Sequence, residues 1–150
     1  MSTKAKKSLG IIISIESEVQ GVFTKIGELT DIPTVLGDKS GKIDVTSFDS
    51  VGYKEFIGDG LKEAPEVQFK GNWIADDDGQ LRIFNLGTSQ ENTKLKIVYP
   101  DAITIEGTGT TIIRGGYVSN LPAITAGKTA ALGFDFSFQF SGSPQMTMAS

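Results

Sequence analysis

Strict alternation of apolar and polar residues in two segments limits the folds open to this chain more than any other property of its sequence. In the segment 134–140 four phenylalanines occupy every second position, with polar residues between them. The segment 66–73 alternates in the same way. Because successive side chains of a β-strand point to opposite faces, each segment predicts a strand with one buried and one solvated face. Such strands are typical of antiparallel sheets.

Further strands are predicted by runs of β-branched residues between turn signals. Glycine supplies most of these signals, with 18 in 150 residues against an average of about 7%. One core is expected at this length, so residues 1–150 are predicted to form a single domain. Its fold class is mainly β, an antiparallel β-sandwich or barrel. The additional expected strands cover residues 11–15, 21–28, 94–99, 102–106 and 110–119.

One segment, 78–86, predicts a short helix that flanks the sheet. The carboxylates at 76–78 suit a helix start, because their side chains accept hydrogen bonds from the free N–H groups there. Gly87 is placed to end the helix as its C′ residue. The residues expected to face the sheet are Leu81, Ile83 and Phe84.

The amino-acid composition excludes most classes of catalytic mechanism. The chain has no cysteine and no histidine, which excludes disulfides, thiolate catalysis and the commonest metal ligands. The carboxylates at 76–78 do not match a calcium loop, and the glycines at 107–109 lack the rest of a phosphate loop. No carboxylate pair stands out for glycosidase chemistry. We therefore predict no catalytic residue, no metal site and no cofactor.

The N-terminus carries lysines at positions 4, 6 and 7 ahead of a short apolar run. Glu16 and Glu18 follow that run without a cleavage pattern, so we expect a flexible basic tail at 1–9 rather than a signal peptide. No run reaches the roughly 18 apolar residues of a membrane span, and no membrane partner is expected. The chain is predicted to stay in the cytoplasm where it is made.

The region 37–65 combines loop-forming glycines and aspartates with many large apolar residues. Loops of this length are uncommon in compact domains and are usually functional or disordered. Two hypotheses remain open: an arm that buries its apolar residues on another subunit, and a meandering loop that buries them on its own domain. The residues concerned are Ile43, Val45, Phe48, Tyr53, Phe56, Ile57 and Leu61.

The same region carries a family resemblance. The runs Ile43-Asp44-Val45-Thr46-Ser47, Tyr53-Lys54-Glu55-Phe56-Ile57 and Gly60-Leu61 resemble, in order and spacing, major tail tube proteins of long-tailed, non-contractile (lambda-type) bacteriophages. The likeness continues through 95–100 and 113–119 to the end of the last predicted strand, and spans roughly residues 20 to 144.

The resemblance implies a structural virion protein and not an enzyme. Hexameric rings of the chain would stack into a hollow tail tube, and the region 37–65 would be the loop that reaches the next ring. The seven apolar residues of that region would be its contacts. The implied partners are further copies of the chain and the tape measure, tail tip and tail terminator proteins. The chain would reside in the virion tail, after assembly in the host cytoplasm. The C-terminal segment of the chain, residues 143–150, is expected to be flexible.

In such a tube double-stranded DNA would pass through without specific binding. The net charge of −4 opposes DNA binding, and six copies at −4 each give −24 per ring. The residues expected to line the lumen are on the polar strand faces: Glu66, Gln68, Asp135, Ser137 and Gln139.

Two other classes of protein stay open. One is the tube of a contractile tail or of a secretion-type system, which would share the same barrel. The other is a small carbohydrate-binding adhesion sandwich that uses its aromatic residues as a sugar platform.

Overall fold

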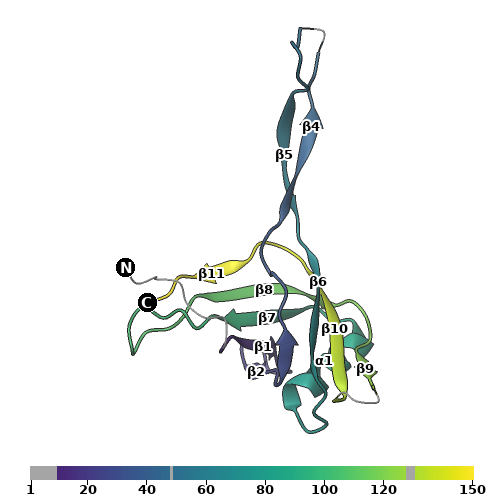
Figure 1. Cartoon of the computed structure of the whole chain (residues 1–150), viewed down its shortest axis with the longest axis vertical. Helices are drawn as coiled ribbons and strands as arrows, with labels where there is room; N and C mark the ends of the chain where they lie inside the picture. The colour runs from purple at the N-terminus through teal and green to yellow at the C-terminus, as the bar shows by residue number, and fades with distance from the viewer. Residues whose placement is uncertain (1–9, 48, 128–130) are drawn as a thin grey trace.

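A computed structural model describes residues 10–47, 49–127 and 131–150. The fold is mainly antiparallel β with one short helix, as the alternation predicts (Figure 1). In chain order the elements are β1 (Ile12–Glu16), β2 (Phe23–Lys25), β3 (Leu29–Asp31), β4 (Lys39–Asp44), β5 (Phe56–Glu63), β6 (Glu66–Asn72), α1 (Asp78–Ser89), β7 (Thr93–Val98), β8 (Thr111–Val118), β9 (Ala123–Thr125), β10 (Gly133–Phe140) and β11 (Gln145–Thr147).

Nine of these strands form one sheet. Its main path runs β2-β1-β7-β8-β10-β6-β3, while β11 pairs with β8 and β9 pairs with β10. The long strand β8 joins two parts of the sheet, because Thr111–Ile113 pair with β11 and Gly116–Val118 pair with β10. The strands β7 and β10 run in clearly different directions in Figure 1, so the sheet bends around its apolar side.

The core lies on this apolar side and consists largely of the alternating positions. All four phenylalanines of β10 are buried, and Phe69 of β6 stacks on Phe136 with ring centroids 4.8 Å apart. Burying an aromatic side chain stabilises a fold by roughly 1.5–3 kcal/mol before entropy is counted. The prediction that these positions form the core is confirmed.

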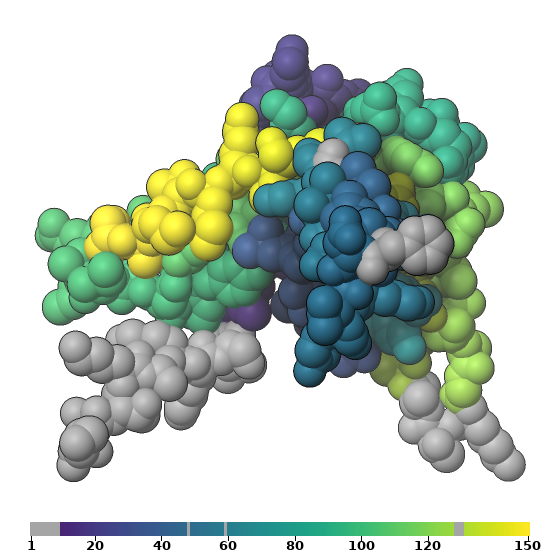
Figure 2. Space-filling model, turned by 90° about the horizontal axis from the view of Figure 1, so that it is seen from above, coloured from purple at the N-terminus to yellow at the C-terminus, as the bar shows by residue number. Residues whose placement is uncertain are grey.

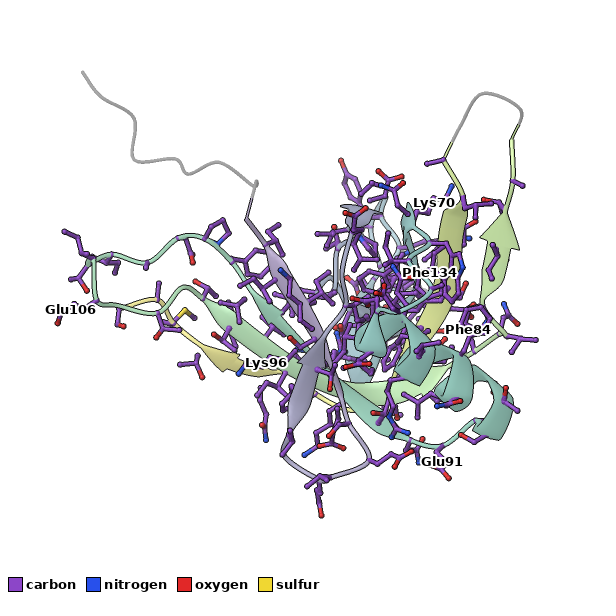
Figure 3. All side chains as sticks on the ribbon, turned by 90° about the horizontal axis from the view of Figure 1, so that it is seen from below. Lys70, Phe84, Glu91, Lys96, Glu106 and Phe134 are labelled. Atoms are coloured by element: carbon purple, nitrogen blue, oxygen red, sulfur yellow. The ribbon has the colours of Figure 1, made fainter. Side chains whose placement is uncertain are left out.

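The helix α1 closes the core beneath the sheet. The side chain of Asp77 caps it by accepting a hydrogen bond from the N–H of Gln80 at 3.0 Å. Gln80, which is fully buried, donates to the carbonyls of Gly27 and Asn72 and so fixes the helix to the loop between β2 and β3 and to the end of β6. The ring centroids of Phe84 and Phe134 lie 5.8 Å apart, and both residues are labelled in Figure 3.

Two details of the predicted helix are wrong. Leu81 is exposed, and the buried apolar side chains are Ile83 and Leu86, since the helix is rotated relative to the expected stripe. Gly87 lies inside the helix, which continues to Ser89, and Gln90 takes the left-handed conformation at φ 59°. A Cβ at Gly87 would lie 2.6 Å from Cδ of Pro122, so this glycine permits close packing instead of ending the helix.

Two other expectations differ from the structure. Residues 102–106 form a loop and not a strand, because no strand pairs with them in the described part of the chain. The segment 143–150, expected as a flexible tail, contains β11, and the backbone N–H and C=O of Ser150 bond to the loop (Ser150 N to Thr108 O, 3.0 Å). Seen from above, the C-terminal segment (yellow) runs beside this loop (green) in Figure 2. The predicted tail at 1–9 lies outside the described residues.

The region 37–65 is a β-hairpin rather than a loop. Within the described part of the chain, its strands β4 and β5 pair only with each other in a separate two-stranded sheet, which projects far from the body of the domain (Figure 1). We call residues 37–65 the arm. No helix among the described residues is both long and apolar enough to cross a membrane.

Candidate assembly interface

The arm exposes its large apolar side chains instead of burying them. Six of the seven predicted contact residues are described, and all six are exposed; Phe48 lies outside the described residues. The exposed fractions range from 42% at Val45 to 85% at Tyr53. The hypothesis of a loop that buries these residues on its own domain is therefore wrong. An isolated two-stranded hairpin has no core of its own, so partner surfaces must cover these side chains if they are to be buried.

The register of the hairpin divides these residues between two faces. Ile43 lies opposite Ile57, and Asp44 lies opposite Phe56. Residues that face each other across an antiparallel pair share a face, and the next rung lies on the other face. The sequence alone did not show this division.

The tip of the arm is closed by local hydrogen bonds. The N–H of Val45 donates to the carbonyl of Glu55 at 2.9 Å, and the N–H of Glu55 donates to Oγ1 of Thr46 at 2.8 Å. The carboxylate of Asp44 accepts from the N–H of Thr46 at 2.9 Å. Thr46 and Asp44 thus define the start of the tip, where the chain leaves the ladder of β4 and β5.

The foot of the arm is held by one buried cation, Arg114 of β8, which is 1% exposed. Its Nη1 donates to the carbonyl of Val35 at 2.8 Å, and its Nη2 donates to Oδ2 of Asp38 at 2.6 Å and to the carbonyl of Gly142 at 3.2 Å. Its guanidinium carbon lies 5.2 Å from the ring centroid of Phe140. One side chain thus connects the sheet, the segment before β4 and the turn before β11.

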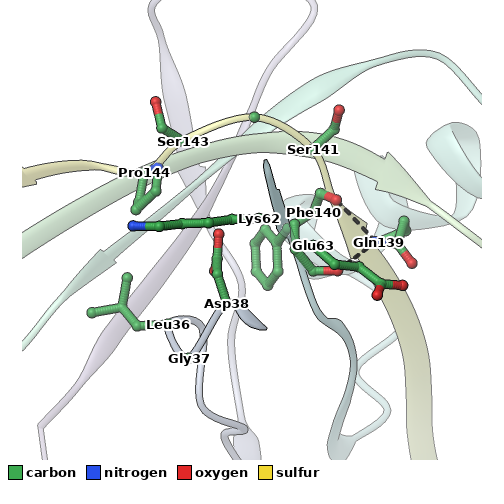
Figure 4. A pocket seen from close by; sticks show the side chains of 12 residues that line it. Leu36, Gly37, Asp38, Lys62, Glu63, Gln139, Phe140, Ser141, Ser143 and Pro144 are labelled. Carbon is green, nitrogen blue, oxygen red and sulfur yellow. Dashed lines mark hydrogen bonds between the residues drawn. The ribbon is translucent and has the colours of Figure 1, made fainter. Parts of the chain in front are cut away.

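The guanidinium also sets the charge of its partner. The hydrogen bond from Arg114 holds the pKa of Asp38 below its ordinary value of 3.8. Asp38 therefore stays ionised near neutral pH, and the ion pair persists there. This pair stands next to a groove of about 740 Å³ at the foot of the arm, lined by residues that include Leu36, Asp38, Lys62, Phe140 and Pro144 (Figure 4).

Sequence reasoning missed Arg114, although a signal for it exists. One face of β8 carries Ile112, Arg114 and Val118, and the two apolar residues among them are buried. A cation on the apolar face of a predicted strand must find partners, because an unpaired buried charge is very costly. The sequence did not identify those partners, because Asp38 lies 76 residues and Gly142 lies 28 residues from Arg114 along the chain.

The five predicted lumen residues lie on one face of β6 and β10. Gln68 pairs with Ser137 and Glu66 pairs with Gln139, opposite the face that carries the phenylalanines. Asp135 pairs with Lys70, a cation that the prediction of a negative surface did not include. Lys70 is labelled in Figure 3. This face therefore carries charges of both signs.

Comparison of the sequence with known proteins gives no match: no family model matches the chain, and neither does any curated protein. Comparison of the structure with solved structures gives several matches. The tail of an empty gene transfer agent particle, refined with C6 symmetry, matches at a TM-score of 0.75 and 16% identity, over 95% of this chain and 99% of that chain.

Two further solved structures come from different assemblies. The SPP1 tail tube matches at a TM-score of 0.61 and 14% identity, over 92% of this chain and 76% of its own. The sheath–tube complex of an extracellular contractile injection system (PVC) matches at a TM-score of 0.64 and 13% identity, over 93% of this chain and 88% of that chain. The chain has the tail tube fold that these assemblies share.

Proposed function

We propose that the chain is a structural subunit of a phage-like tail tube, in which hexameric rings stack into a hollow tube. The observation that carries this proposal is the arm, which exposes apolar side chains that only other chains can cover. The C6 symmetry of the similar gene transfer agent tail supports six subunits per ring. The arm would reach the adjacent ring, and no enzymatic role is part of the proposal.

The tube would be a conduit for double-stranded DNA in the tail of a virion or virion-like particle. The polar face of β6 and β10 would line the lumen, where paired charges of both signs, such as Asp135 and Lys70, would give DNA no continuous cationic track. The tape measure, tail tip and tail terminator proteins are the further partners that we propose. A similar structure, with a TM-score of 0.65, comes from a sheath/tube terminator complex.

The sequence runs of the arm favour a non-contractile tail. A tube of a contractile system is the second candidate, since the contractile injection system gives a TM-score of 0.64, similar to the 0.61 of the SPP1 tube. Co-purification of tubes with a sheath protein from the native source would support the second candidate. Tubes without a sheath would support the first.

The proposal is tested by negative-stain electron microscopy of the purified chain at increasing concentration. Hollow tubes with a six-fold end view are the expected result. Monomers that persist at high concentration would contradict the proposal, and glycan binding by such monomers would favour an adhesion domain.

The role of the arm is tested by replacing residues 41–60 with an Asn-Gly turn. None of the buried apolar residues recorded for the described chain falls within this segment, so the variant should remain a folded monomer and form no tubes. Ile57→Asp (52% exposed) should block stacking in the same way, while Leu81→Asp on α1 (42% exposed) is the matched control that should still assemble. Tubes formed by the shortened variant would refute the role of the arm.

A further inference from the structure

A second projection leaves the body of the domain sideways and not along the arm. It consists of the loop 101–110 and the C-terminal segment 145–150, which run side by side (Figure 1, Figure 2). Glu106 marks its outer end in Figure 3. We call these two segments the side projection.

Hydrogen bonds hold the side projection in one shape. The carboxylate of Asp101 accepts from the N–H and from Oγ1 of Thr110, both at 2.6 Å. The backbone oxygen of Ser150 accepts from the N–H of Ile103 at 2.9 Å and from that of Thr104 at 3.2 Å. A partner would therefore meet a preformed surface and would not have to order a free loop, which lowers the entropic cost of binding.

The side projection exposes apolar side chains that its own domain does not cover. Ile103 is 76% exposed, Ile105 is fully exposed and Met148 is 68% exposed. Glu106 is the only charged residue of the sequence in 102–110, and 143–150 has none. Apolar side chains gathered on the surface in this way mark an interaction site.

A second group of exposed apolar side chains surrounds β9. Leu121 is 63% exposed, Ile124 is 48% exposed and Leu132 is 50% exposed. Ile124 lies opposite Phe134, and Leu132 lies two residues before Phe134, so both side chains share one face of the β9–β10 pair. No charged residue occurs in the sequence at 119–127 or 131–134. We call Leu121, Ile124 and Leu132 the β9 patch.

The side projection and the β9 patch lie on opposite sides of the body. The three views agree on this placement: β9 is on the right in Figure 1, and the side projection is on the left in Figure 1, Figure 2 and Figure 3. A closed ring of identical chains needs two different surfaces on each chain, because each chain meets one neighbour on either side. Two apolar surfaces on opposite sides meet this requirement, and neither buries a charge through its three apolar side chains.

We propose that the side projection of each chain packs on the β9 patch of the next chain in the same ring. This inference rests on the proposed function, and it names the surfaces through which the ring closes. The arm takes no part in this contact. Ring closure and ring stacking would then use separate parts of the chain and could be disrupted separately.

Chemical cross-linking of introduced cysteines tests this inference, because the natural chain has none. Ile105→Cys places a thiol on the side projection, and Ile124→Cys places one on the β9 patch. The two variants are assembled together with an equal amount of natural chain, and the pelleted tubes are treated with a short bismaleimide. The products are separated by size after denaturation. In the matched control Leu81→Cys on α1, at a site 42% exposed, replaces Ile124→Cys.

The mixture of Ile105→Cys and Ile124→Cys should give products of two chains. Either variant without the other, and the control mixture, should give single chains. A chain that carries both cysteines should give a ladder of products that ends at six chains, because the ring closes there. Met148→Cys with Leu132→Cys repeats the test on a second pair of positions.

The unfavourable outcomes are distinguishable. Pelleted tubes that yield no two-chain product from either pair would overturn the inference and leave the proposed function standing. Two-chain products from Ile105→Cys alone would also overturn it, since like surfaces would then meet. A ladder that continues beyond six chains would do the same, because the contact would then join different rings. If the natural chain itself forms no tubes, the proposed function fails, and this inference with it.

Discussion

Replacing Arg114 by Met tests whether one buried cation holds the arm to the sheet. The methionine keeps an unbranched apolar side chain against Phe140 but cannot donate to the carbonyls of Val35 and Gly142. A hydrogen bond from a charged donor contributes about 1.5–3 kcal/mol, so two such bonds contribute roughly 3–6 kcal/mol. The buried Nε of Arg114 has no hydrogen-bond partner among the described residues, and its removal returns about 1–3 kcal/mol. The expected net loss is about 3 kcal/mol in the free energy of unfolding.

The ion pair with Asp38 is not counted in this figure, because the Asp38 side chain still contacts water (17% exposed); its loss adds to the difference at neutral pH. Urea unfolding of the monomer, followed by the fluorescence of the single tryptophan Trp73, measures the loss. Trp73 is a suitable probe since its ring lies 5.2 Å from that of Phe84 and 5.7 Å from that of Phe134. Lys94→Met, which removes an exposed cation from β7, is the control and should change stability by less than about 0.5 kcal/mol.

The same pair of proteins gives a pH test. The pKa of Asp38 is lower in the folded chain than its ordinary value of 3.8. The stabilisation that ionised Asp38 gives to the folded chain is therefore fully present above pH 3.8. The contribution is lost as the pH falls from 3.8 through the folded-state pKa. Arg114→Met should lack this part of the acid sensitivity, and its difference from the natural chain should narrow below pH 3.8. If Arg114→Met unfolds within about 0.5 kcal/mol of the natural chain at neutral pH, the reasoning about the foot of the arm is refuted.

Two further predictions concern the core and the polar face. Ile83→Ala should lower the free energy of unfolding by about 2–5 kcal/mol because Ile83 is fully buried, whereas Leu81→Ala on the same helix should cost far less; equal losses in urea unfolding would contradict the observed orientation of α1. Gln68→Lys with Ser137→Lys places two cations opposite each other on the proposed lumen face. This double variant should still assemble into tubes but should slow DNA ejection from particles. Asn85→Lys on α1 is the control, which should leave both tube assembly and ejection kinetics unchanged. Unchanged ejection kinetics in the double variant would refute the assignment of this face to the lumen.

The strands of the body were predictable because their pattern is local. Alternation in 66–73 and 134–140 requires one buried face, and the structure buries Phe69 and the four phenylalanines of β10. The helix was predictable for the same reason, since a capping carboxylate and an apolar stripe lie within one short segment. Its end was not, because the role of Gly87 depends on Pro122, which lies 35 residues further along the chain.

The arm illustrates the limit of such reasoning. Glycines at 41, 58 and 60 interrupt the alternation, and the apolar residues of β4 and β5 fall on both faces, so the segment lacks the pattern of a half-buried strand. Residues 102–106 show the reverse case. They are suited to a strand, but a strand forms only where a second strand pairs with it, and the C-terminal residue Ser150 bonds to this loop instead.

Local sequence patterns are sufficient to predict the mainly β fold, the positions of most strands and the apolar face of the core, and they mark residues 37–65 as unusual in composition. These properties depend on the spacing of side chains along the chain, which short-range geometry converts into faces. The folded chain was needed to show that residues 37–65 form a projecting hairpin with two apolar faces, and that Arg114 holds its foot. Both depend on pairing between distant segments, since a hydrogen bond or a strand register is defined by two partners and the sequence places only one at a time.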